Sequence, residues 1–426
     1  MRHLTFISMA ALAIASFCSC ESESLDTLNK ESGEFTEIPM MITKSDSEMI
    51  EAGNEFAFDL FEAISNDEKH SNQDIVISPL SLSFLLGALD NGAGGRTREQ
   101  ICEVLGYDGA ELSAVNSFSR KIMQGCGMVD NKVKVKIANA VVVNKRFSLT
   151  ESFKDSLSTY YDALVESMDF EDPGTLDYIN AWSKEMSGGL IPEILEENEF
   201  EDKAALYAMN SIYFKGGWAS EFKSEDTTEE IFHALEGDTK VQMMRRIGEY
   251  SYGYGDGFST IRLPHGNGSY AMYIMLPDEV MSVEDMVKII DRNSFDVAGM
   301  ISGTVDVRLP KFTIESKFDL VDIMKGLGMT DAFEAGVADF SNMIENSPIG
   351  ELSLGNLLQK SKIIVNEEGS EASSVSIGEI LVTSPTPSTP VLFQADRPFM
   401  YLIKEETTGA IYFIGMKMAQ LSSRLR

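Results

Sequence analysis

One stretch near the C-terminus, residues 365–391, constrains the fold more than any other part of the 426-residue chain. Its side chains alternate with a period of two, which is the spacing of a β-strand. The first set, which is small or apolar throughout, is Ser370, Ala372, Ser374, Ser376, Gly378, Ile380 and Val382. The second set, which carries both carboxylates, is Glu371, Ser373, Val375, Ile377, Glu379 and Leu381. A surface segment needs no such sorting, whereas a segment that must enter between two strands does.

The second half of this stretch has a different composition. Pro385, Pro387 and Pro390 follow the alternating part. Because proline fixes φ and removes a backbone donor, we expect this half to stay extended and unpaired.

Composition bounds the class of protein. Hydrophobic residues make up 43% of the chain, which is ample for a large buried core. The length would allow two or three domains, but we find no repeat and no second domain. The net charge of −32 argues against nucleic acid as a partner, because such binding needs clustered Lys and Arg. The acidity itself indicates little beyond solubility.

Residues 1–19 are typical of a targeting segment. Arg2 and His3 precede an apolar run that is too short for a confident membrane span. The run ends in Cys18-Ser19-Cys20, which resembles the cleavage site of a bacterial lipoprotein signal peptide. Cys20 is the expected lipidation site because the residue before it, Ser19, is small. An ordinary secretory signal followed by a stray cysteine pair is the alternative.

Residues 20–50 predict an acidic, flexible spacer. Between positions 21 and 50, acidic residues far outnumber the two lysines, and apolar periodicity is weak. Glu21 and Glu23 resemble the signals that send some lipoproteins to the outer face. We therefore expect an outer-membrane lipoprotein at the cell surface or outside the cell, with the periplasmic face as the alternative. The lipid anchor would be its only contact with the membrane.

Apart from Cys18 and Cys20 in the signal region, the chain has two cysteines, Cys102 and Cys126. They can form at most one disulfide, and the sequence leaves open whether they do. The helical apolar pattern around Cys102 favours a small buried core residue.

The flanks of the alternating stretch carry a family resemblance. Residues 362–369 (KIIVNEEG) and 393–399 (FQADRPF) resemble the borders of the reactive-centre loop of the serpins, the suicide protease inhibitors. Ser78-Pro79, which reads as a helix cap and first helical residue, is similar to another serpin landmark. An ordered series of such landmarks covers about residues 50–420. The resemblance implies an α+β serpin domain over residues 51–426, with three β-sheets, eight or nine helices and an exposed loop.

The sequence offers little catalytic or metal-binding chemistry. The four histidines are far apart and lack metal-ligand spacing, and no G-x-S-x-G motif occurs. We therefore expect no catalytic residue, no metal and no cofactor. A surface hydrolase with a dispersed site is one rival, and a non-inhibitory serpin used for binding or structure is the other.

The resemblance implies a mechanism in which a target serine protease supplies the chemistry. Its serine attacks a loop carbonyl and forms an acyl-enzyme. The cut loop then inserts into the main sheet and distorts the tethered protease before water completes hydrolysis. The partner is therefore a protease, and the inhibitor is expected to be a monomer. The hinge residues that the resemblance assigns are Glu367, Gly369, Ser370, Ala372, Ser374 and Ser376.

The cleaved bond is assigned by the same resemblance. In the family it commonly lies sixteen residues past the acid that matches Glu367, which gives Thr383-Ser384. The X-Pro bonds nearby are poor substrates, and Val382-Thr383 is the runner-up. Counting back from Pro398 would place the bond nearer Ser388. A small uncharged residue before the cut favours elastase-like or subtilisin-like proteases, with cysteine proteases as an alternative.

Five further residues match positions beneath the sheet where it opens for the loop. They are Ser78, Ser81, Asn210, Trp218 and Gln359. Gln359 stands where the family usually has histidine; Gln can form hydrogen bonds but cannot titrate. Ordinary core packing is the alternative interpretation for these residues.

Overall fold

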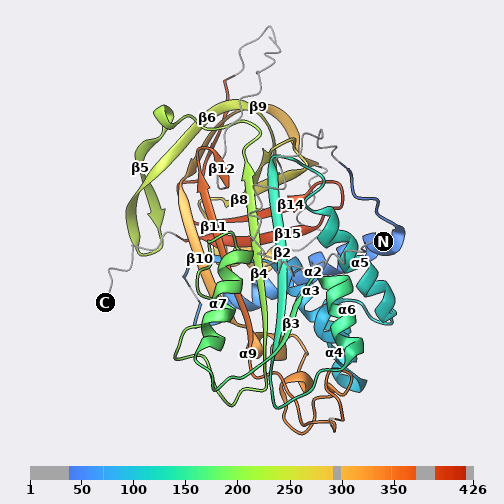
Figure 1. Ribbon diagram of the computed structural model, residues 1–426. Coiled ribbons are helices and arrows are strands. Elements are labelled where there is room, and N and C mark those ends of the chain that lie inside the picture. The colour runs from blue at the N-terminus through green and yellow to red at the C-terminus, as the bar shows by residue number, and fades with distance from the viewer. Residues whose placement is uncertain (1–37, 71, 291–298, 347, 371–388, 419–426) are drawn as a thin grey trace, which may run out of the picture. The chain divides into compact units, whose positions relative to one another are not determined.

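The computed structural model describes residues 38–70, 72–290, 299–346, 348–370 and 389–418. Eight α-helices and two β-sheets lie in these ranges (Figure 1), which confirms the α+β class and the expected number of helices. The helices are α2 (Lys44–Asn66), α3 (Pro79–Asp90), α4 (Gly95–Leu105), α5 (Leu112–Gly125), α6 (Glu151–Tyr161), α7 (Gly174–Met186), α8 (Val283–Ile289) and α9 (Val321–Gly326).

A six-stranded sheet forms the centre of the molecule. Its order is β10 (Phe312–Asp319), β11 (Leu357–Asn366), β12 (Gly369–Ser370), β4 (Leu206–Gly217), β2 (Val133–Asn144) and β3 (Leu164–Met168). One face packs on α7 through a small apolar cluster that includes Ala138, Trp182 and Met209. The other face joins the main core, to which α3 and β1 (Ile75–Ile77) also contribute. In Figure 1 its long strands run roughly vertically, with α7 in front.

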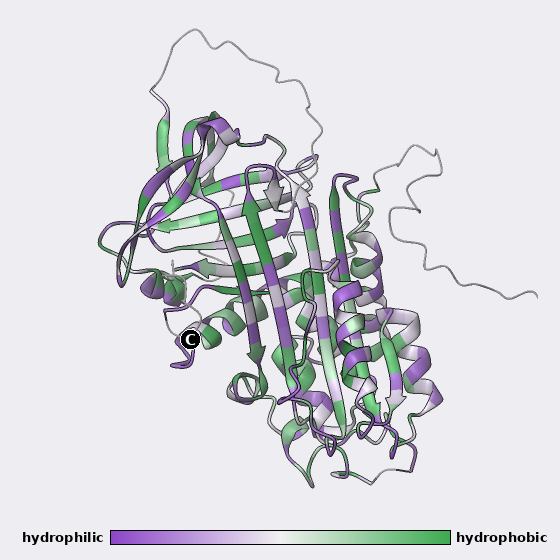
Figure 2. Cartoon of the chain, turned by 60° about the vertical axis from the view of Figure 1, so that its left-hand side comes forward, coloured by the Kyte–Doolittle hydropathy of each residue, from purple (hydrophilic) through white to green (hydrophobic). Residues whose placement is uncertain are grey.

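The remaining strands form a nine-stranded sheet. Its order is β1, β15 (Ile411–Lys417), β14 (Phe399–Glu405), β8 (Tyr270–Pro277), β7 (Phe258–His265), β6 (Gly237–Gly255), β9 (Ile301–Pro310) and β13 (Val391–Gln394), and β5 (Thr228–Ala234) pairs with β6. β8 is buried along its whole length and reads as a continuous apolar strand. Figure 2 shows green, hydrophobic residues on the strands of the sheets.

The resemblance implied three sheets, whereas the strands of the described residues form two. The difference arises at β6, whose 19 residues pair with β5 at the start, with β9 in the middle and with β7 at the end. A strand of this length joins two sections that would otherwise be separate sheets.

The helix that opens the domain begins earlier than the sequence suggested. α2 starts at Lys44, so the expectation of an extended spacer does not hold for residues 44–50. Thr43 and Asp46 form a reciprocal cap, in which each side chain accepts a hydrogen bond from the other residue's backbone N–H. Met49 and Ile50 are then buried on the first turns.

Two further expectations concern cysteines and caps. Cys102 and Cys126 are both free and buried, and so do not form a disulfide. Ser78 caps α3 by accepting a hydrogen bond from the N–H of Ser81, with Pro79 as the first helical residue, so this cap is confirmed.

Among the described residues, no helix has the length and apolar character needed to cross a membrane.

Candidate functional site

The candidate site is the line between β4 and β11, the two central strands of the six-stranded sheet. They pair in parallel from Leu357 with Ala208 to Gln359 with Asn210. Beyond this point the two strands separate, and among the described residues no strand lies between residues 211–215 of β4 and residues 360–364 of β11. We call this gap between the two strands the seam. Its backbone N–H and C=O groups form a template for one additional strand.

β12 occupies the upper end of the seam (Figure 1). After Asn366 the chain reverses, and Gly369 and Ser370 pair with both neighbours, opposite Asn366 and Val365 on β11 and opposite Gly217 and Gly216 on β4. The first residues of the alternating stretch therefore already lie as a strand in the sheet.

Gly369 is required at this reversal by its backbone conformation and its surroundings. Its φ is +144°, and a Cβ atom would lie 2.6 Å from Cα of Gly217 and 2.8 Å from the nitrogen of Trp218. Residues with side chains rarely adopt this conformation. The side chain of Asn366 accepts hydrogen bonds from the N–H groups of Glu368 (3.0 Å) and Gly369 (3.2 Å), which stabilises the turn.

Trp218 holds the chain at the start of the hinge. Its indole N–H donates to the carbonyl of Asn366 at 2.9 Å, and its backbone N–H donates to the carbonyl of Glu368 at 2.9 Å. The indole is 6% exposed and stacks on the ring of His265, with centroids 4.5 Å apart. The family position therefore carries a direct contact with the hinge.

Glu367 forms a second attachment. Its carboxylate lies 2.8 Å from Nζ of Lys311 and accepts a hydrogen bond from Oγ1 of Thr227 at 3.0 Å. Burial alone raises the pKa of Glu367, but the hydrogen bonds from Lys311, the backbone and Thr227, together with the charge of Lys311, outweigh it and hold the pKa below its usual value. The acid is therefore ionised at neutral pH and fixes the end of β11.

The lower end of the seam is closed by a buried polar cluster. Gln359 accepts from the N–H of Ser78 (3.1 Å) and donates to its carbonyl (2.9 Å). Ser81 donates its hydroxyl to the side-chain oxygen of Asn210, whose amide in turn donates to the Ser81 carbonyl at 3.1 Å. The structure thus brings Ser78, Ser81, Asn210 and Gln359 together, as the resemblance implied.

Other site assignments lie outside the described residues. These are the hinge positions Ala372, Ser374 and Ser376, and the bond assignments Val382, Thr383 and Ser384. Cys20, the expected lipidation site, also lies outside them.

Three residues of the site were not assigned from the sequence. Lys311 and Thr227 contact Glu367, and His265 supports Trp218. Each meets its partner across roughly fifty to 140 positions of chain, so no local spacing could have linked them. His265 offers no catalytic base here, because it is fully buried against Trp218 and Phe214.

Comparison with known proteins identifies relatives of this arrangement. The family model described as "Serpin (serine protease inhibitor)" matches residues 51–419. Mouse neuroserpin is 30% identical over 359 residues, which are 82% of this chain and 86% of the relative. The crystal structure of native protease nexin-1 with heparin aligns with a TM-score of 0.79 at 30% identity, covering 88% of this chain and all of the other. Human thyroxine-binding globulin, at 22% identity and a TM-score of 0.79 over 88% of this chain, shares the fold.

The buried imidazole leads to a prediction about acid. Burial lowers the pKa of His265 from 6.5 to about 4, although the backbone of Gly216 and Gly217 counteracts this in part. Between pH 6.5 and 4 the unfolded chain binds a proton at His265 more tightly than the folded protein does. His265 therefore does not reduce the free energy of unfolding above pH 6.5, and it reduces it increasingly as the pH drops towards 4. We expect the total loss from this group to be on the order of 3 kcal/mol. Urea unfolding from pH 7.5 to 4, compared with His265→Phe, measures it.

The contribution of His265 is the difference between the two pH profiles. The variant keeps an aromatic ring under Trp218 and should flatten the profile between pH 6.5 and 4. Fluorescence of Trp218 in a Trp182→Phe background should follow the same difference. Identical profiles in both proteins would show that other groups cause the acid dependence.

A second prediction concerns the lower end of the seam. Gln359→Leu leaves the backbone N–H and carbonyl of Ser78 buried without their side-chain partner. The carbonyl still accepts a hydrogen bond from the N–H of Leu82 at 3.1 Å, so only the N–H of Ser78 is left unsatisfied. An unsatisfied buried group costs about 1–3 kcal/mol, and we expect a loss of that size in the free energy of unfolding. Ser152→Ala, an exposed change, is the control, and an unchanged urea midpoint for Gln359→Leu would contradict the role of the cluster.

Proposed function

Because the chain belongs to the serpin family, a family of protease inhibitors, we propose that it inhibits serine proteases by inserting its cleaved loop into the seam. The protease serine would attack the loop and become an ester, and the loop from Ser370 onward would then enter between β4 and β11. The tethered protease would be dragged along and distorted before deacylation.

The double pairing of β12 carries this proposal. Gly369 and Ser370 already pair with both central strands, and in the described part of the chain no strand lies between β4 and β11 directly below them. Insertion would extend this existing strand pairing, so that no new pairing would have to be started. The alternating stretch would place its small, uncharged set over the buried face, where a charge would cost several kcal/mol.

The loop composition suggests the class of target. We place the cleaved bond at Thr383-Ser384, with Val382-Thr383 as the runner-up, and infer elastase-like or subtilisin-like serine proteases as targets. Cysteine proteases are a secondary class. A non-inhibitory binding role is the second candidate, and the fold likeness to thyroxine-binding globulin supports it at the level of fold alone.

Mixing the full chain with an elastase-like and a subtilisin-like protease tests the proposal. We expect an SDS-resistant adduct and a released C-terminal peptide whose mass places the cut after Thr383. Ser370→Arg should convert the inhibitor into a substrate, because a charge next to Gly216 on the inserting strand opposes burial. We expect the adduct yield to fall at least tenfold.

Ser152→Arg, which adds the same charge at an exposed position of α6, is the matched control and should leave the yield unchanged. Clean cleavage of the unaltered chain without any adduct would favour the non-inhibitory role. An adduct that forms equally well with Ser370→Arg would contradict insertion through the hinge.

We also propose that the protein is a lipoprotein anchored through Cys20 and acts as a monomer at the surface of a bacterial cell. The signal-like segment before Cys20 and the acidic residues after it support this. Expression in a Gram-negative host should give radiolabelled-palmitate incorporation that Cys20→Ser abolishes and Cys18→Ser preserves. Labelling that survives Cys20→Ser would contradict the anchor.

A further inference from the structure

The outer part of the six-stranded sheet contains a second open edge. β2 pairs with β4 from Val133 to Val143, but on its other side β3 pairs only from Ala140 onward. Among the described residues, positions 133–139 of β2 therefore have no strand on that side. Such an edge presents unpaired N–H and C=O groups in line with the start of β3.

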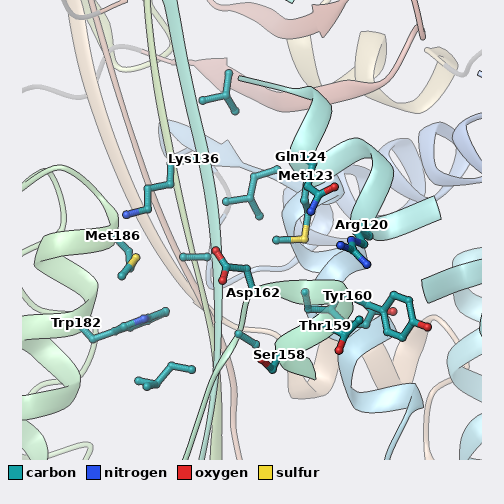
Figure 3. A pocket seen from close by; sticks show the side chains of 16 residues that line it. Arg120, Met123, Gln124, Lys136, Ser158, Thr159, Tyr160, Asp162, Trp182 and Met186 are labelled. Atoms are coloured by element: carbon teal, nitrogen blue, oxygen red, sulfur yellow. The ribbon is translucent and has the colours of Figure 1, made fainter. Parts of the chain in front are cut away.

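A groove of about 790 Å³ borders residues 135–138 of this edge. Its walls come from α5, α6 and α7, and β2 runs through it (Figure 3). In Figure 3, Lys136 lies on the same side of β2 as Trp182 and Met186, whereas Met123 and Arg120 lie on the other side. A strand laid along the edge would thus place alternate side chains into two different halves of the groove.

Both halves offer apolar contacts. Val135 and Ile137 point to the main core on the side of α5, where Met123 also packs. Ala138 belongs to the cluster on the side of α7 with Trp182. An extended segment with apolar residues could therefore bury them on either side of the edge.

Positive charge concentrates around the same edge. Lys134 lies directly opposite Lys215 on β4, and Lys136 is two residues further along the same face. Like charges opposite one another destabilise a sheet. Among the described residues these three lysines make no ion pair with an acid, although the chain carries a net charge of −32. The groove lining itself contains the cations Arg120 and Lys136 and one carboxylate, Asp162.

We propose that this edge of β2 is a docking site for an extended, acidic segment of a partner protein, which adds to the sheet as a strand beside residues 133–139. Backbone hydrogen bonds to the edge supply part of the affinity, and alternate side chains supply the selectivity. Carboxylates facing α7 pair with Lys134 and Lys136, and apolar side chains facing α5 contact Met123, Val135 and Ile137.

A synthetic peptide tests the proposal in the full chain. The probe is a fluorescein-labelled peptide of about seven residues that alternates glutamate and valine, since seven residues span the open edge. Fluorescence anisotropy should show saturable binding, and hydrogen exchange should show protection of the amides of residues 133–139. A peptide with lysine in place of glutamate should bind at least tenfold more weakly.

Two changes separate strand addition from simple charge attraction. Methylation of alternate peptide nitrogens keeps every charge but removes the donors, and it should weaken binding at least tenfold. The double variant Lys134→Glu/Lys136→Glu should also weaken it at least tenfold, while Lys44→Glu/Lys203→Glu, which changes the net charge equally at exposed sites, should not.

Three results would overturn the proposal. They are no binding of the acidic peptide, equal binding of the methylated peptide, or equal loss in the control double variant. In that case the lysines serve only to keep other strands away from the edge, which is a common use of lysine on edge strands. None of these variants alters the seam, so inhibition of a protease is unaffected by either outcome.

Discussion

The structure depends on the buried polar cluster at the point where β4 and β11 separate. Below it the two strands are paired; above it they diverge, and no strand of the described residues lies between them until β12. Asn210 and Gln359, which lie in register on the two strands, bond to Ser81 and Ser78 at the start of α3. Breaking these hydrogen bonds would leave buried polar groups unsatisfied, which costs free energy. The cluster therefore keeps the lower end closed. Under the proposed mechanism the sheet would have to open at this cluster, and its hydrogen bonds would have to break for that.

The upper end of the seam is held by different chemistry. Two hydrogen bonds from Trp218 to backbone carbonyls and one ion pair between Glu367 and Lys311 fix the turn, and Gly369 allows the end of β4 to approach it closely. Of the residues that the structure describes, Gly369 and Ser370 lie between the two strands there. The site therefore has a firmly held start, and under the proposed mechanism the free energy of insertion would come from the residues that follow Ser370.

Much of this site could be predicted from the sequence, because the relevant signals are local. The cap at Ser78 and the glycine at 369 each follow from neighbouring residues. The partners of Glu367 and Trp218 could not be predicted, since Lys311, Thr227 and His265 approach them only through the tertiary fold. The two-sheet arrangement and the early start of α2 were missed for related reasons. The residue pattern of a strand does not specify which strands it pairs with. The capping box of α2 lies in the acidic segment that was expected to be a spacer, so the start of the helix was not recognised.

The six-stranded sheet thus offers two places for an added strand, and charge distinguishes them. The inward face of the seam is lined by uncharged residues such as Ile212 and Ser361, both almost fully buried, so an inserted strand must be neutral on that side. The edge of β2 is flanked by Lys134 and Lys136 and would favour acidic side chains. An acidic peptide is therefore a poor competitor for the seam, and the neutral set of the chain's own loop gains little at the β2 edge. The backbone groups of the two edges are chemically alike, but the side chains beside each edge differ. These side chains therefore select which segment binds at which edge.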